Sequence, residues 1–319
     1  MANIFSFLNP NSNDMISKMN SKELNEFKTL LNEFQLELRN NLGFDKNVTF
    51  GMEFECELAD IDQIMCYLYS MHLDDKVDVK NDVSLNAGVE ITTPVYFDIH
   101  NVYKEISNIC KGLNQYAFVY SNTGSHIHIG SQILEKEENL YKFLYLWMAY
   151  EDIIFRFTNG EFLTARPNIY LYSLPLRRQK NLFALDIASL SLKDLKEIFI
   201  DTSVRLSNIS SLKKIKYKNT IEFRCPNGTL EPVIWQNNLN LFVKMIEYAK
   251  SSDFDYSTLE NSTYDFNDIS DYDKVCFEEA IKFADLIFKN NLDKIYFLRQ
   301  YFKDYEVSNK YIKAKKFVK

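Results

Sequence analysis

The chain has 319 residues, of which 46% are hydrophobic and 15% aromatic, and its formal net charge is −7. This length and apolar content are sufficient to bury a core in one large domain or two modest ones, and they exclude disorder of the whole chain. The negative charge argues against sequence-independent nucleic-acid binding, which needs a basic face. The longest apolar run stops at Glu151, well short of the ~18 residues of a membrane span. Neither nucleic acid nor a membrane is therefore an expected partner.

The N-terminus and the cysteines both favour a cytoplasmic protein. The first 14 residues have no basic region and no long apolar segment, so we expect no secretory signal. The cysteines are odd in number and show no CxxC spacing, which predicts buried free thiols in place of disulfides or a structural zinc site. They are Cys56, Cys66, Cys110, Cys225 and Cys276.

Hydrophobic periodicity predicts an irregular mixture of helices and strands. In the first half of the chain we expect, in order, a helix at 21–40, a strand at 48–58, a helix at 60–71, two strands within 77–94, a helix at 103–113, a broken strand pair over 117–130 and a long helix at 137–157. A loop at 158–180, a helix at 192–200, a strand at the end of 213–224 and a helix at 233–250 follow. The remainder is predicted to be an acidic linker at 251–273, helices near 272–289 and 292–305, and a basic tail at 309–319. Helices and strands do not alternate regularly, which predicts an α+β fold.

Glycine is scarce, and this excludes the glycine-rich nucleotide-binding folds. The chain has 8 Gly, against roughly 22 expected from an average usage near 7%. It contains no GxxxxGK[ST], GxGxxG, GxSxG or HExxH motif. Any nucleotide chemistry must therefore use another scaffold.

Two strand-like segments in the first third of the chain carry glutamates. In 51–57 (GMEFECE), alternation places Glu53, Glu55 and Glu57 on one face and apolar side chains on the other. In 88–94 (GVEITTP), Glu90 lies among β-forming residues. Taken alone, each segment is better explained as an ordinary solvated strand face or a surface glutamate than as part of a functional site.

Two later segments contain the scarce histidine and arginine residues. Segment 124–130 (GSHIHIG) holds two of the four histidines, His126 and His128, on one strand face, where they can serve one ion or ligand. Segment 220–230 (TIEFRCPNGTL) places Glu222 and Arg224 on one face. That pair is either a simple salt bridge or part of a site.

The four segments say more together than singly. If they are neighbours, they form a mainly antiparallel sheet with one face packed on helices and the other lined by Glu53, Glu55, Glu90, His126, His128, Glu222 and Arg224. Clustered carboxylates with histidine are a divalent-cation ligand set, and the hard oxygen ligands favour Mg²⁺ or Mn²⁺, although the histidines leave Zn²⁺ open. Bound cations would recruit phosphates, and the arginine would stabilise charge in phosphoryl transfer.

The same four segments, in this order, resemble the amidoligase family, a carboxylate–amine ligase branch of the glutamine synthetase and γ-glutamylcysteine ligase superfamily. The resemblance covers about residues 48–250. Asp82 and Ser84 also match a D-G-S segment of the family, with Val83 in place of glycine, and Arg166 and Arg205 resemble its accessory arginines. The family resemblance implies a glutamine-synthetase-like catalytic domain at 46–250. An N-terminal helical segment at 1–45 precedes this domain, and the acidic linker, C-terminal helices and basic tail at 251–319 follow it.

The resemblance also implies a reaction and a role for each site residue. Such enzymes use ATP to phosphorylate a carboxylate, and an amine then attacks the acyl phosphate to give an amide. Magnesium, or manganese, would be bound by Glu53, Glu55, Glu90, His126 and Glu222. The ATP or acyl-phosphate oxygens would be contacted by Arg224, Arg205, Arg166 and His128, and the catalytic residues would be Arg224, Glu222 and His128. The partners would be small-molecule, peptide or protein carboxylates and amines, and superfamily members range from monomers to large rings.

Two other functions fit the same residues. A metal-dependent hydrolase could use the HxH pair and the carboxylates, and it would hold stoichiometric zinc without nucleotide affinity. A non-catalytic protein could retain the sheet for binding, with no nucleotide turnover. Every ligand type that the ligase needs is present, which argues against the non-catalytic alternative, because a decayed site should have lost at least one of them.

Overall fold

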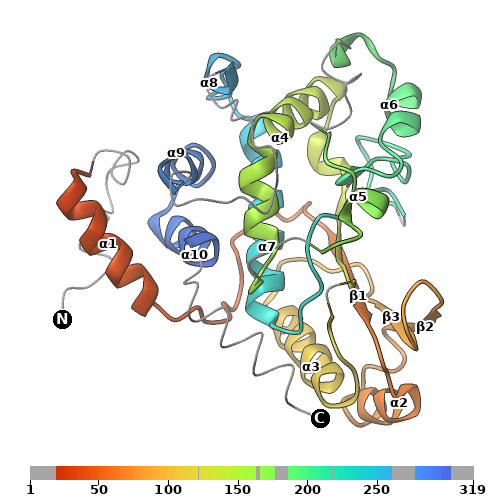
Figure 1. Cartoon of the computed structure of the whole chain (residues 1–319). Helices are drawn as coiled ribbons and strands as arrows, with labels where there is room; N and C mark the ends of the chain where they lie inside the picture. Colours follow the sequence, from red (N-terminus) through yellow and green to blue (C-terminus); the bar gives the residue numbers. More distant parts are fainter. Residues whose placement is uncertain are drawn as a thin grey trace.

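The computed structural model describes residues 19–120, 122–162, 166–176, 186–216, 218–260 and 277–302. It confirms the predicted α+β class: a sheet of six antiparallel strands packs against a group of helices (Figure 1). The predicted basic tail and the linker beyond residue 260 lie outside the described residues.

The sheet is open, with the strand order β2-β3-β1-β4-β6-β5. The strands are β1 (Phe50–Cys56), β2 (Asp78–Asp82), β3 (Gly88–Thr92), β4 (Ser125–Gly130), β5 (Val204–Arg205) and β6 (Thr220–Phe223). The four segments with glutamate, histidine or arginine correspond to β1, β3, β4 and β6, and these are consecutive neighbours. Along β1 buried and part-exposed residues alternate strictly, because successive side chains point to opposite faces of a strand.

Two long helices cover the apolar face of the sheet. α4 (Glu137–Thr158) and α7 (Pro232–Lys250) lie side by side at the centre of Figure 1. The Phe54 ring of β1 lies 4.1 Å from Trp235 of α7, centroid to centroid, and the Phe223 ring of β6 stacks 4.1 Å from Phe242. Aromatic pairs of this kind hold the sheet and helices in a fixed relation.

The remaining helices surround this centre. They are α1 (Ser21–Glu33), α2 (Ile61–Ser70), α3 (His100–Tyr116), α5 (Ile169–Tyr172), α6 (Leu192–Ile198), α8 (Ser257–Glu260), α9 (Phe277–Ile287) and α10 (Asn291–Phe302). α9 and α10 lie beside α4 and α7 on the side away from the sheet, and α1 packs on α10 (Figure 1). The side chains of α1, α9 and α10 join the same hydrophobic cluster as those of the sheet. The predicted boundaries at residues 45 and 250 stay a prediction.

The first helix is shorter than the sequence predicts. It ends at Glu33, and Phe34 has extended dihedrals. Beyond it, the backbone N–H of Glu37 donates to the Tyr296 hydroxyl at 3.3 Å, and that of Arg39 donates to the Gln236 amide oxygen at 2.8 Å. Side chains of α10 and α7 therefore take the hydrogen bonds that a continued helix would have formed.

Three of the four described cysteines are buried, as predicted, and all four are free. Cys66 is exposed, and the prediction of a buried thiol is wrong there, because α2 buries only Ile64 and Leu68. Cys276 lies outside the described residues.

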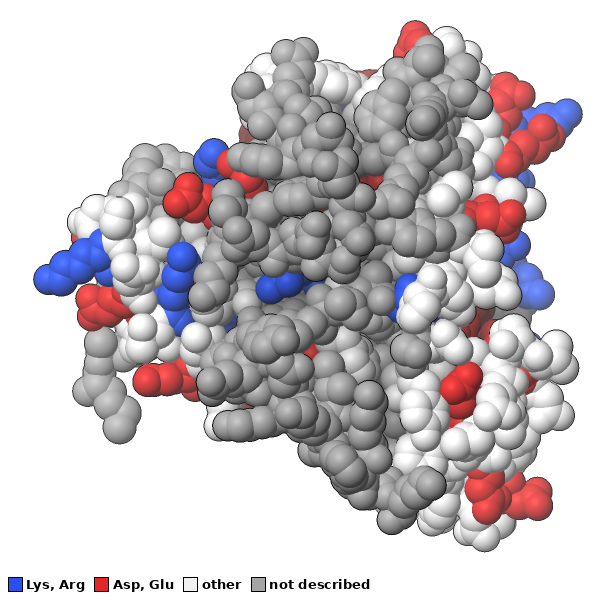
Figure 2. Space-filling view, viewed as in Figure 1, with Lys and Arg blue, Asp and Glu red and all other residues white. Residues whose placement is uncertain are grey.

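In the described part of the chain, no helix combines the length and apolar character of a membrane span. On the face shown in Figure 2, Lys and Arg side chains lie among Asp and Glu side chains without separating by sign.

The stacked rings of Phe242 and Phe223 join the sheet to α7, so truncating one of these side chains is expected to destabilise the protein strongly. Phe242 is fully buried against Phe223 and Trp147. We expect Phe242→Ala to lower the free energy of unfolding by about 3–5 kcal/mol, measured by urea denaturation. Phe97→Ala is the matched control, because that ring is 42% exposed. Equal losses in the two variants would contradict this packing.

Candidate active site

The strand register builds a cluster of polar side chains on the face opposite the helices. Residues directly opposite in antiparallel strands point to the same side of the sheet. Glu53 of β1 pairs with His126 of β4, and His128 of β4 pairs with Glu222 of β6. Glu55 pairs with Glu90 of β3 in the same way. Residues from four separate segments thus share one surface.

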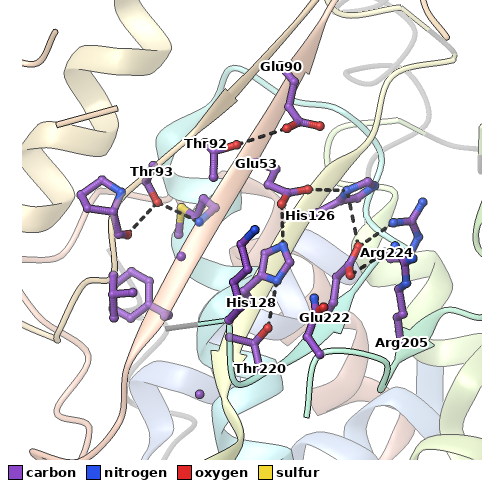
Figure 3. A pocket seen from close by; sticks show the side chains of 18 of the residues that line it. Glu53, Glu90, Thr92, Thr93, His126, His128, Arg205, Thr220, Glu222 and Arg224 are labelled. Atoms are coloured by element: carbon purple, nitrogen blue, oxygen red, sulfur yellow. Dashed lines mark hydrogen bonds and ion pairs between the residues drawn. The ribbon is translucent and has the colours of Figure 1, made fainter. Parts of the chain in front are cut away.

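The two histidines interleave with the carboxylates at the centre of the cluster (Figure 3). His126 lies 3.1 Å from Glu53 through Nδ1 and 3.3 Å from Glu55 through Nε2. His128 Nε2 lies 2.9 Å from the second Glu53 oxygen, and its Nδ1 lies 3.2 Å from the Thr220 hydroxyl. Glu53 is therefore contacted by both rings at once.

Arginines lie against the outer carboxylate of the cluster. Arg224 Nη1 is 2.5 Å from Glu222 Oε1, and Arg205 Nη1 is 3.6 Å from Glu222 Oε2. The Arg224 Nε also donates to the Tyr172 carbonyl at 2.9 Å. The predicted salt bridge exists, and it borders the carboxylate and histidine cluster.

These residues fit a divalent cation. Ligand atoms of Glu53, His128 and Glu222 lie within 4.8 Å of one another. The Nε2 atoms of His126 and His128 are buried and have no well-aligned hydrogen-bond partner among the described residues. Buried polar atoms are normally satisfied, so these two nitrogens are consistent with ligand positions. Two carboxylates and a histidine suit Mn²⁺ or Mg²⁺, and they do not exclude Zn²⁺.

The close contacts shift the proton affinities of the cluster. Burial would raise the pKa of Glu53, but its contacts with His126 and His128 outweigh this and lower the pKa below its usual range. The same two histidines, with Arg224 and Arg205, lower the pKa of Glu222 against the effect of its burial. Burial would lower the pKa of His128, and Glu53 and Glu222 raise it. Near neutral pH the two carboxylates are thus held in the charged form that binds cations.

Glu90 lies at the edge of the cluster. Its carboxylate accepts a hydrogen bond from the Thr92 hydroxyl at 3.2 Å. Its pKa is raised by burial and by the neighbouring charges of Glu53 and Glu55. A cation between these carboxylates would remove that penalty.

The cluster forms the floor of a cavity of about 540 Å³. Its wall includes every predicted site residue except Arg166. It also includes polar residues that the site prediction did not contain: Asp82, Ser84, Thr92, Tyr172, Asn208, Lys216, Lys218 and Thr220. The resemblance of residues 82–84 to the D-G-S segment of the family could have indicated Asp82 and Ser84. No sequence pattern indicates the two lysines, because they lie in a loop without hydrophobic periodicity.

Arg166 lies behind the cavity wall. It is 3% exposed, its Nη2 donates to the Arg224 carbonyl at 2.6 Å, and its Nη1 is 3.8 Å from Glu55 Oε2. The Gly124 backbone N–H donates to the same Glu55 oxygen at 2.6 Å. Arg166 and Gly124 therefore fix the position of the Glu55 carboxylate, and the predicted contact of Arg166 with ATP stays a prediction.

Gly124 is required by this packing, and Gly51 is not. A Cβ at position 124 would lie 1.9 Å from the Arg166 guanidinium and 3.0 Å from the Glu55 carboxylate, whereas one at position 51 would meet nothing closer than 3.6 Å. Overpacking of this kind costs typically about 1–3 kcal/mol, so we expect Gly124→Ala to lower the free energy of unfolding by that amount. Gly51→Ala is the control and should change stability little. Thermal and urea unfolding of both variants provides the comparison.

Replacing Glu90 by an uncharged residue is expected to stabilise the metal-free protein in a pH-dependent way. Its raised pKa means that ionisation is disfavoured in the fold, so it destabilises the protein above its unfolded pKa of about 4.3 and has no effect well below it. We expect Glu90→Gln to increase the free energy of unfolding in EDTA at pH 7.5 and to leave it unchanged near pH 3.5. Glu26→Gln, at an exposed position of α1, should show no such pH dependence. A gain that is the same at both pH values would contradict the assignment.

A comparison with known families gives a match over most of the chain. The family described as "Putative amidoligase enzyme" matches residues 11–246. Among curated proteins, none matches this chain.

Proposed function

This chain belongs to the amidoligase family, and on that premise we propose that it is an ATP- and Mg²⁺-dependent ligase that joins a carboxylate to an amine. The carboxylate would first accept the γ-phosphoryl group of ATP, and the amine would then displace phosphate to form the amide. The observation that carries the proposal is the convergence of Glu53, Glu55 and Glu222 with two histidines on one sheet face, with Arg224 and Arg205 at its border.

The acidic cluster would hold the metal ions. Glu53, Glu55, His126 and Glu222 would supply ligands at the centre, and Glu90 would supply one at the edge. Bound Mg²⁺ would neutralise phosphate charge and orient the transferred group. The contacts of Arg166 and Gly124 with Glu55 keep that carboxylate oriented toward the cluster.

The arginines and His128 would act on the reacting groups. Arg224 is held by Glu222 and by the Tyr172 carbonyl, so its guanidinium is preorganised beside the cluster. A fixed positive charge at this place would stabilise the negative oxygens of phosphoryl transfer. Thr220 contacts Nδ1 of His128 and Glu53 contacts its Nε2. His128 would therefore either join Glu53 and Glu222 as a cation ligand or hold a proton on Nε2.

A zinc hydrolase is the competing function. The Glu53, His128 and Glu222 set also offers three protein ligands, which is the number that catalytic zinc sites use. Metal analysis of the purified protein separates the two. Stoichiometric zinc together with hydrolysis and no nucleotide binding would contradict the ligase, whereas nucleotide-dependent Mg²⁺ or Mn²⁺ binding supports it.

The proposal predicts metal-dependent ADP release with mixtures of candidate carboxylates and amines. We expect Arg224→Ala to lower kcat by about 100-fold or more, the range seen when one charge-stabilising donor is removed. Glu55→Gln should produce a comparable loss through metal binding. Glu57→Gln is the matched control: Glu57 directly follows β1 and does not line the cavity. Equal turnover in all variants would contradict the site.

A further inference from the structure

Helix α4 buries a carboxylate among the side chains of the core. Glu151 is 1% exposed, and it directly follows Tyr150, where non-helical dihedrals kink the helix. A carboxylate is costly to bury unless hydrogen bonds compensate for the loss of water. The hydrogen bonds of Glu151 therefore indicate what this residue contributes beyond packing.

One oxygen of this carboxylate joins three parts of the chain. Glu151 Oε1 accepts a hydrogen bond from the Trp147 indole of its own helix at 3.1 Å. It also accepts one from the Ser203 hydroxyl at 2.8 Å and one from the Leu176 backbone N–H at 2.8 Å. Ser203 directly precedes β5, and Leu176 lies in the segment that follows α5. Glu151 therefore ties both of these segments to α4.

The same two segments hold Arg224. The Ser203 carbonyl accepts a hydrogen bond from the Arg224 backbone N–H at 2.9 Å, and the Tyr172 carbonyl accepts one from the Arg224 Nε at 2.9 Å. The segments also pair with each other, because the Ser203 N–H donates to the Leu174 carbonyl at 3.0 Å. Hydrogen bonds thus run from Glu151 through both segments to the backbone and the guanidinium of Arg224.

The Tyr172 carbonyl needs an anchor, because α5 is short and lies at the surface. The helix has four residues, and Tyr172 is 46% exposed. Leu176, four residues later, is fully buried and donates to Glu151. Glu151 is therefore an anchor for the carbonyl that holds the guanidinium.

The direction of the Arg224 guanidinium matters for the proposed reaction. Glu222 attracts Nη1, and the Tyr172 carbonyl accepts from Nε. Among the described residues these contacts leave Nη2 for a ligand in the cavity, whose wall includes Arg224. A preorganised donor stabilises the charge of a transition state, and a small displacement of it can lower the rate strongly.

We propose that Glu151 is a positioning residue: acting through Ser203 and the segment 172–176, it directs Arg224 into the cavity. This step rests on the proposed function, in which Arg224 stabilises the transferred phosphoryl group. Glu151 lies in the core and outside the cavity wall, so it would touch neither substrate nor metal. The role requires an acceptor oxygen at this place, which glutamine supplies and leucine does not.

A double-mutant cycle in the full-length protein separates positioning from stability. We expect Glu151→Leu to lower kcat for ADP release about tenfold or more when Arg224 is present, and less than about twofold further when Arg224 is replaced by alanine. Glu151→Gln should recover most of the lost kcat. Asn139→Leu is the matched control, because Asn139 is also buried on α4 but donates to the Leu134 carbonyl. It should lower stability and leave kcat unchanged.

The position of Arg224 is a second readout that needs no turnover. In crystal structures we expect its Nε to leave the Tyr172 carbonyl in Glu151→Leu and to stay there in Glu151→Gln. If Glu151→Leu does not fold, Ser203→Ala removes one of the same hydrogen bonds with a smaller change and should show the same coupling to Arg224. An equal loss of kcat with and without Arg224, or an unmoved guanidinium, overturns the inference. Absence of ADP release from the wild type rejects the ligase, and the guanidinium position then still decides the role of Glu151.

Discussion

The strand register forces negative charges together, and the rest of the site depends on how that repulsion is relieved. Glu53 and Glu55 are two residues apart in β1, so their side chains point to the same face of the sheet. The pairing of the strands places Glu222 of β6 on that face as well. In a partly buried place such charges repel strongly. His126 and His128 lie between them, and the arginines lie at the outer side. Burial disfavours the ionised form of a carboxylate, yet the carboxylates of this cluster are held in that form. Partly buried charges of this kind are typical of cation-binding sites.

The apolar face of the same strands explains why the cluster keeps its geometry. Phe54 and Phe223 alternate with the glutamates in β1 and β6 and pack on Trp235 and Phe242. A shift of register by one residue would exchange the two faces and bury the carboxylates among aromatic rings. The hydrophobic core therefore specifies the polar site. The second layer of helices, α9 and α10, supports this packing from behind.

Local alternation was sufficient to predict which residues share the polar face. The order of the four segments then predicted the family. Sequence patterns could not predict the course of residues 34–40, where side chains of α7 and α10 replace the hydrogen bonds of a continued helix. Nor could they predict that Arg166 lies behind Glu55, or that Asn219 holds the β5–β6 loop. These positions depend on contacts between segments far apart in the chain, which no short-range pattern encodes.

The distribution of the cysteines determines how the described part of the protein responds to oxidants. Cys225 directly follows Arg224, yet it is buried, and burial raises the pKa of its thiol to about 12. Cys56 ends β1 and is buried in the same core. Thiolates react, and protonated buried thiols are inert. Of the four described cysteines, only Cys66 on α2 is exposed, so peroxide or a maleimide label would modify α2 and leave the strands of the site chemically intact.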